Sequence, residues 1–189
     1  GETGEGGFMR TYDVINLSAN PPTTTRFNVP VQIVMSSVKA SSDARFVVGL
    51  DLDARGFTYW PLQTMSGAGH HPPESKYGMT GFAWRPGTHE IGFIGPSNQF
   101  WLCDVDKENP LGCGHTAFSG VPEGAFVRIF RADGSAVVLA VTPAGSTGLG
   151  GTTYTLVQFS NDPLAAKATG GDRVTFTELG GLNASVRLR

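Results

Sequence analysis

Alternation of apolar and polar residues with a period of two dominates the chain, and it places successive side chains on opposite faces of a strand. The clearest run is 44–54, in which Phe46, Val48, Leu50 and Leu52 share one parity. Similar runs bounded by Gly, Pro, Asn or Asp predict strands at 8–17, 27–40, 57–65, 79–85, 89–95, 98–105, 113–119, 125–142, 152–160, 172–179 and 182–189. About ten or more short strands at this spacing predict an all-β fold, an antiparallel β-sandwich or jelly roll.

Turn residues indicate which strands are neighbours. Pro86-Gly87 and Asp133-Gly134 each lie between two apolar runs and predict hairpins, and 44–54 is expected to pair with 31–39. Pro61 cannot donate to a ladder, so it predicts an edge or bulged strand at 57–65.

Two stretches depart from this pattern. Residues 66–78 (SGAGHHPPESKYG) have no period and predict a long surface loop, of the kind that often carries function. Residues 163–169 are the one short helix expected, with Asp162 as N-cap, Pro163 at the first position and Gly170 as the stop signal.

Composition supports a β-rich chain with little helix. Of 189 residues 26 are Gly and 12 are Pro, and only 16% are charged. A net charge of −2 with scattered Lys and Arg argues against nucleic acid as a partner, and the sequence has no apolar run long enough for membrane insertion. We expect one domain over 5–189.

Several features favour a secreted or cell-surface protein. Residues 1–4 (GETG) resemble a scar left by a secretion vector, so we exclude them from the domain. Passage through a secretory pathway supports a disulfide between Cys103 and Cys113, which would close a loop of about ten residues. Asn16 and Asn183 begin N-glycosylation sequons; the alternative is that both sequons arise by chance in a Ser/Thr-rich chain.

Part of the chain resembles a known family of extracellular modules. The string VKASSDAR, which begins at Val38, is followed by HEIGFIG, FWLCDVDKENPL and AFSG, which ends at Gly120. This series over about 31–120 resembles the farnesoic-acid-methyltransferase-like domain, an extracellular β-sandwich. The Gly-Gly-Trp-Gly-Asn-Thr centre of that family is absent, and the loop 66–78 stands in its place.

The resemblance implies a fold and no reaction. A methyltransferase that uses S-adenosylmethionine would show strands alternating with helices and a Gly-rich turn that opens a helix. Here Gly67-Ala68-Gly69 is followed by His70, His71 and two prolines. No cofactor and no catalytic residue is therefore predicted.

A second, less specific resemblance concerns residues 121–141 (VPEGAFVRIFRADGSAVVLAV). Their pattern is similar to strands of capsid protruding domains, which attach viruses to hosts. That likeness implies a viral capsid or spike domain, which could form a homodimer.

Oxygen-bearing side chains follow the first cysteine. Asp104, Asp106 and Glu108 stand at alternate positions, as calcium ligands do, but the Gly and Glu that an EF-hand requires are missing. A looser surface Ca²⁺ site and a solvated turn remain the two interpretations. Asp51 and Asp53 share a strand face that we expect to be solvent-facing.

The sequence contains no catalytic motif of high specificity. His70 and His71 are adjacent and would point in opposite directions if extended, so they cannot easily chelate one metal, and no HExxH or Gly-x-Ser-x-Gly motif occurs. A hydrolase is the third functional class that the sequence leaves open, but the prediction is that the chain is not an enzyme.

Aromatic residues give the main functional hypothesis. Aromatic faces near Asp and Asn suit recognition of a sugar ring or of a protein hot spot, although half of such a set in a sandwich belongs to the core. The predicted binding edge consists of Tyr59, Trp60, His70, His71, Tyr77 and Trp84. We therefore expect an extracellular adhesion or glycan-binding module whose partner is a glycan or a protein receptor, with a viral attachment domain as the alternative.

Overall fold

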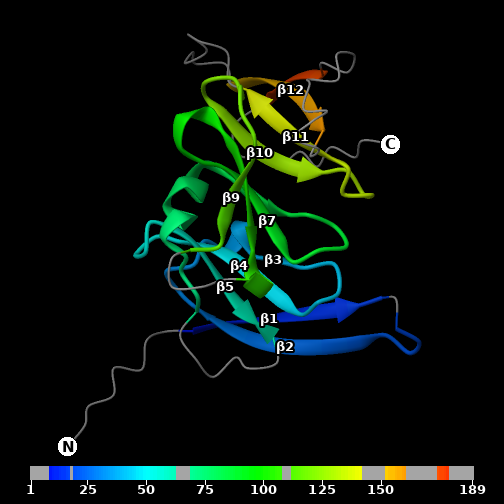
Figure 1. Cartoon of the computed structure of the whole chain (residues 1–189). Coiled ribbons are helices and arrows are strands. Elements are labelled where there is room, and N and C mark those ends of the chain that lie inside the picture. Colours follow the sequence, from blue (N-terminus) through cyan, green and yellow to red (C-terminus); the bar gives the residue numbers. More distant parts are fainter. Residues whose placement is uncertain are drawn as a thin grey trace, which may run out of the picture. The chain divides into compact units, whose positions relative to one another are not determined.

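Antiparallel strands make up most of the structure, a computed structural model that describes residues 9–17, 19–62, 69–107, 112–141, 152–160 and 174–178 (Figure 1). They form four sheets of two, four, three and four strands. The predicted all-β, antiparallel class is confirmed. Among the described residues, no helix is long and apolar enough to cross a membrane. The expected helix at 163–169 and the last expected strand lie outside the described residues.

The chain divides into two compact units, Gly1–Met79 and Thr80–Arg189. The expectation of one domain over 5–189 stays a prediction, and each unit is described separately below.

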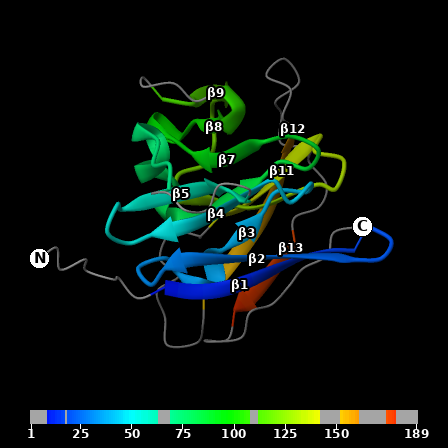
Figure 2. The same cartoon turned by 90° about the horizontal axis from the view of Figure 1, so that it is seen from below.

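The first unit contains a two-stranded ribbon and a three-stranded sheet (Figure 2). The ribbon pairs β1 (Met9–Asn16) with β2 (Thr23–Pro30), and the sheet has the order β3-β4-β5. The sheet strands are β3 (Lys39–Ala40), β4 (Phe46–Asp51) and β5 (Gly56–Pro61), with the short 3-10 helix η1 (Met35–Ser37) before them. As Pro61 predicts, β5 is at one end of the sheet order.

The expected strand at 27–40 is wrong in its second half. Regular pairing in β2 stops at Pro30, whose missing N–H cannot extend a ladder. Beyond Pro30, the side chain of Ser37 connects this segment to β4. Its hydroxyl donates to Val34 O at 2.6 Å and accepts from Leu50 N at 2.7 Å. The predicted pairing with 44–54 is thus limited to β3 and to an isolated bridge between Ile33 and Asp51.

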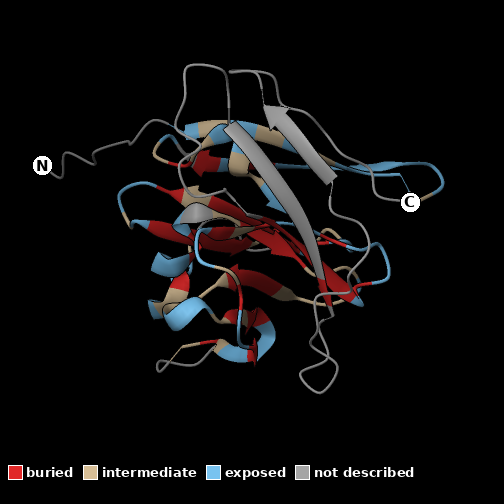
Figure 3. Cartoon of the chain, turned by 90° about the horizontal axis from the view of Figure 1, so that it is seen from above, coloured by how far each residue is buried: buried red, intermediate tan, exposed pale blue. Residues whose placement is uncertain are grey.

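The core of the first unit lies under the ribbon and against the sheet. Tyr12 and Val14 of β1 pack on a buried cluster, and the Tyr12 ring stacks on Phe27 with centroids 5.4 Å apart. The buried members of the cluster are Phe27, Val29, Ile33, Val47, Trp60 and Leu62. In Figure 3 the residues of β1 are pale blue and tan, whereas Phe27 and Val29 of β2 and most of β4 and β5 are buried.

The hydroxyl of Tyr12 is buried and has no hydrogen-bond partner among the described residues. A hydroxyl that loses water on folding and gains no partner costs about 1–3 kcal/mol. We therefore expect Tyr12→Phe to raise the free energy of unfolding by about 1 kcal/mol in urea denaturation. Tyr12→Leu, which removes the stacked ring, should lower it, and a loss of stability in the Phe variant would contradict the prediction.

The second unit packs two four-stranded sheets against each other through one hydrophobic cluster. The first sheet consists of β6 (Phe82–Trp84), β7 (Glu90–Ile94), β8 (Phe100–Asp104) and β9 (Gly114–Phe118), and η4 (Pro96–Asn98) and η5 (Val105–Lys107) flank β8. The second consists of β10 (Ala125–Phe130), β11 (Ala136–Val141), β12 (Thr152–Ser160) and β13 (Val174–Glu178).

Aromatic rings from both sheets build this core. Phe118 stacks on Phe100 at 4.8 Å and on Phe159 at 5.3 Å between centroids. Both predicted hairpins are confirmed, since β6 pairs with β7 and β10 with β11, and Gly134 in the second turn has a positive φ of 68°. Strands follow one another in sequence order within each sheet, a meander order that fits the sandwich alternative because a jelly roll pairs strands remote in sequence.

Candidate functional site

The second half of the predicted loop 66–78 contains a 3-10 helix, η3 (Pro73–Thr80), so the expectation of an unpatterned loop is wrong there. A 3-10 helix has three residues per turn, so residues three apart share one side. Pro72, Ser75 and Gly78 follow this spacing, and all three are buried. Lys76 and Met79 also follow it, and both are exposed.

Glycines set the close approach of η3 to β5. A Cβ added to Gly56 would lie 2.7 Å from the backbone C of Ser75, and one added to Gly78 would lie 2.6 Å from Cδ1 of Phe57. Larger side chains at these two positions would push the helix away from the strand. The inner side of η3 therefore packs closely against β5.

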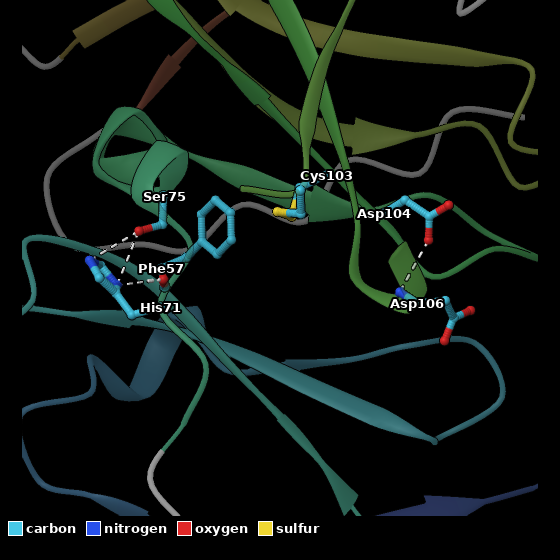
Figure 4. Close-up of a disulfide and its surroundings, with 7 residues drawn as sticks. Phe57, His71, Ser75, Cys103, Asp104 and Asp106 are labelled. Carbon is cyan, nitrogen blue, oxygen red and sulfur yellow. Dashed lines mark hydrogen bonds between the residues drawn. A yellow bond between two sulfur atoms is a disulfide. The ribbon is translucent and has the colours of Figure 1, made fainter. Parts of the chain in front are cut away.

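A hydrogen-bonded triad holds the start of η3 (Figure 4). His71 Nδ1 lies 3.1 Å from Phe57 O, and Ser75 Oγ lies 3.0 Å from Nδ1 and 3.2 Å from Nε2 of the same ring. In the tautomer with hydrogen on Nδ1, the imidazole donates to the carbonyl and accepts from the hydroxyl. Ser75 is completely buried, so in this structure the pair anchors the segment and its hydroxyl does not reach solvent.

The solvent-exposed surface of η3 presents an aromatic ring with a cation over one of its faces. Tyr77 is 38% exposed and Met79 is 40% exposed. Lys76 Nζ lies 5.2 Å from the centroid of the Tyr77 ring, within the range of a cation–π contact. We call Lys76, Tyr77 and Met79 the ledge.

Three of the predicted site aromatics belong to the core. Tyr59, Trp60 and Trp84 are buried, at 3%, 4% and 8% exposure, so the expectation of an aromatic-lined edge is wrong for them. Trp60 belongs to the buried cluster of the first unit, and a Cβ on Gly69 would lie 2.4 Å from its ring, so the chain covers the indole closely. The alternation along β5 assigns residues to two faces of the strand but does not say which face is covered, and in the structure both faces are buried.

The histidines remain at the surface, as expected. His70 forms an isolated bridge with Tyr59, and its ring stacks on the Tyr59 ring at 5.1 Å with an interplanar angle of 15°. His71 is exposed as well. Of the predicted set, the structure thus leaves His70, His71 and Tyr77 accessible.

Lys76 and Met79 were missed by the sequence reasoning. The available signal was the spacing of Pro72, Ser75 and Gly78 together with Pro73 and Glu74 in the first turn, which favours a helix start.

The predicted disulfide is confirmed. Cys103 of β8 is bonded to Cys113, which directly precedes β9, with 4.8 Å between Cα atoms (Figure 4). It staples the β8–β9 hairpin, and no cysteine among the described residues is free.

Carboxylates beside the disulfide are occupied by protein donors. Asp104 Oδ2 lies 2.9 Å from Lys107 Nζ, and Asp104 Oδ1 accepts from Asp106 N at 3.1 Å. Hydrogen bonding to Asp104 raises the pKa of Lys107. Asp106 Oδ2 lies 2.5 Å from His89 Nδ1.

Two of the three candidate calcium ligands therefore already contact cationic or N–H groups, and Glu108 lies outside the described residues. Within the described part of the chain, no group of three or more His, Cys, Asp or Glu could hold a metal ion. The Ca²⁺ site stays a prediction.

Comparisons with known proteins identify no family for the chain. No protein-family model matches the sequence, and no curated protein matches it. Among solved structures, the chain is similar to the β-propeller domain of the Trilobed protease from Pyrococcus furiosus, with 11% identity and a TM-score of 0.40 over 92% of this chain and 55% of that chain. The chain spans about half the length of that domain. The resemblance to the farnesoic-acid-methyltransferase-like domain stays a prediction.

Proposed function

We propose that the chain is an extracellular recognition module that binds a glycan on another surface through the ledge of Lys76, Tyr77 and Met79. The observation that supports this best is Tyr77, an exposed ring on a segment whose inner side, with Ser75 and Gly78, is buried against the protein. A preorganised ring loses little conformational entropy when it binds a partner.

The chemistry of the ledge suits a sugar. The apolar CH face of a pyranose packs on an aromatic ring, and nearby donors bind its hydroxyls. Tyr77 supplies the ring, Lys76 supplies an ammonium donor that lies over one face of this ring, so the sugar would stack on the other face, and Met79 adds apolar surface that can adapt to the ligand.

Binding to a glycan array by the secreted chain tests this proposal. We expect Tyr77→Ala to weaken binding to the positive glycans about tenfold or more, as loss of an interface anchor does, because the stacking surface disappears. Tyr77→Phe keeps the ring and should bind within about threefold of the wild type. Leu52→Ala, at another exposed apolar residue, serves as the matched control and should leave binding unchanged.

The same measurements contain the results that would contradict the proposal. A blank array, with binding retained on enzymatically deglycosylated cells, would show that the partner is a protein receptor and not a glycan. Glycan binding that survives Tyr77→Ala would show that the ledge is not the binding site. Loss of binding in EDTA would instead implicate Asp104 and Asp106.

A further inference from the structure

Strand β1 presents a long edge with no partner strand in the described structure apart from β2. Its outward face carries Met9, which is 54% exposed, and Ile15, which is 57% exposed, with Thr11 and Asp13 between them. An exposed edge of this kind is a template for pairing with another chain unless charge, proline or a cover protects it.

The charges on β1 give that edge little protection, because each is engaged within the protein. Asp13 forms a two-point ion pair with Arg26 of β2, at 2.8 and 3.1 Å. Arg26 lowers the pKa of Asp13, chiefly through this hydrogen bond. Arg10 donates through Nη1 to Ile33 O at 3.1 Å.

A second copy of β1 is complementary to the first in one antiparallel register. With Tyr12 on the two-fold axis, Met9 would lie opposite Ile15 and Thr11 opposite Asp13, so apolar residues meet apolar ones on the outward face. Moving the register by two residues either places Asp13 opposite Asp13 or places Met9 opposite Asp13. Like charges or mixed pairs of this kind destabilise a ladder, so the first register is selected.

Asn16, at the end of this edge, is the first residue of the glycosylation sequon Asn-Leu-Ser in the sequence. Asn16 is the last residue of β1 and is exposed, and the neighbouring Leu17 is 80% exposed, so the folded chain leaves room there for a bulky substituent. A branched glycan at the end of a strand obstructs the approach of a second strand along the same edge.

We infer that an N-linked glycan on Asn16 covers this end of the ribbon and keeps β1 from pairing with β1 of a second copy. The inference rests on the proposed passage through a secretory pathway, but not on the ledge or its ligand. Glycan attachment is thereby a structural device that keeps the protein monomeric.

The experiment compares the chain secreted from eukaryotic cells with its Asn16→Gln variant. Mass spectrometry of the peptide that contains Asn16 should show a glycan on the wild type. Size-exclusion chromatography with light scattering over a hundredfold range of concentration should give a wild-type monomer, and a dimer fraction that grows with concentration in the variant.

Two double variants locate the contact. Asn16→Gln with Ile15→Lys places a cation on the outward face of β1 and should restore the monomer. Asn16→Gln with Leu52→Lys makes the same change at an exposed residue outside β1 and should still dimerise. If Asn16→Gln is poorly secreted, an endoglycosidase can trim the glycan of the folded wild-type protein to a single sugar, and this should produce the same dimer.

Three results would overturn the inference: an unmodified Asn16 in the secreted protein, a dimeric glycosylated wild type, or a monomer after removal of the glycan. A blank glycan array would leave it untouched, so its failure and that of the proposed function are distinguishable.

Discussion

Replacing both cysteines, Cys103→Ala with Cys113→Ala, is expected to lower the free energy of unfolding by about 2–4 kcal/mol. The bond joins residues ten apart in sequence, and the entropy that such a cross-link removes from the unfolded chain corresponds to about 3 kcal/mol. Both cysteines are buried, so the smaller side chains add a minor packing loss. Urea unfolding followed by tryptophan fluorescence measures the change.

Reductant provides the control for this prediction. Dithiothreitol should lower the free energy of unfolding of the wild type to about that of the double variant, and it should leave the stability of the variant unchanged. A double variant as stable as the oxidised wild type would show that the staple contributes nothing. Because β8 and β9 are held in register beside the bond, hydrogen exchange should also increase first in this hairpin.

The elements that the sequence predicted well are those determined by local chemistry. Asp133-Gly134 requires a turn that glycine can adopt, and the flanking alternation then determines that β10 pairs with β11. The disulfide was predictable because the chain has only two cysteines and features of a secreted protein.

The elements that the sequence did not predict depend on contacts between distant segments. Tryptophan is a residue type that is common in binding sites. Trp60 is nevertheless buried, because it packs against Phe27 and Val29 of the ribbon and because Gly69 passes close to its ring. Alternation separates the two faces of a strand but cannot say whether a second layer covers the outer one. The exposed aromatic residue of the candidate site is therefore Tyr77, and the tryptophans belong to the core.

The same limit applies to Asp51, which the strand pattern predicts to face solvent and which is in fact buried. Its Oδ1 accepts from Asp53 N and Ala54 N, each at 3.0 Å, and its Oδ2 accepts from the Thr58 hydroxyl at 3.2 Å. A carboxylate at the end of β4 thus closes the turn into β5. Asp51 does belong to the β4–β5 ladder, but its side chain turns to the donors of the turn and does not face solvent.

We expect Asp51→Ala to lower the free energy of unfolding by about 2–3 kcal/mol, because three donors lose a charged acceptor at once. Asp51→Asn keeps one acceptor oxygen for the two backbone N–H groups and should cost about 1 kcal/mol. Thr58→Val removes only the third hydrogen bond and should cost about as much as the Asn variant. Urea denaturation of the three variants gives the comparison.

The turn that Asp51 closes also positions the site. Asp51 pairs with Gly56 in the β4–β5 ladder, and Gly56 and Phe57 are the surface on which η3 rests. Loosening the turn should therefore increase amide exchange in η3 and weaken binding through Tyr77, whereas Leu52→Ala in the same turn should do neither. An Asp51→Ala protein with unchanged stability and unchanged exchange in η3 would contradict this link between the turn and the ledge.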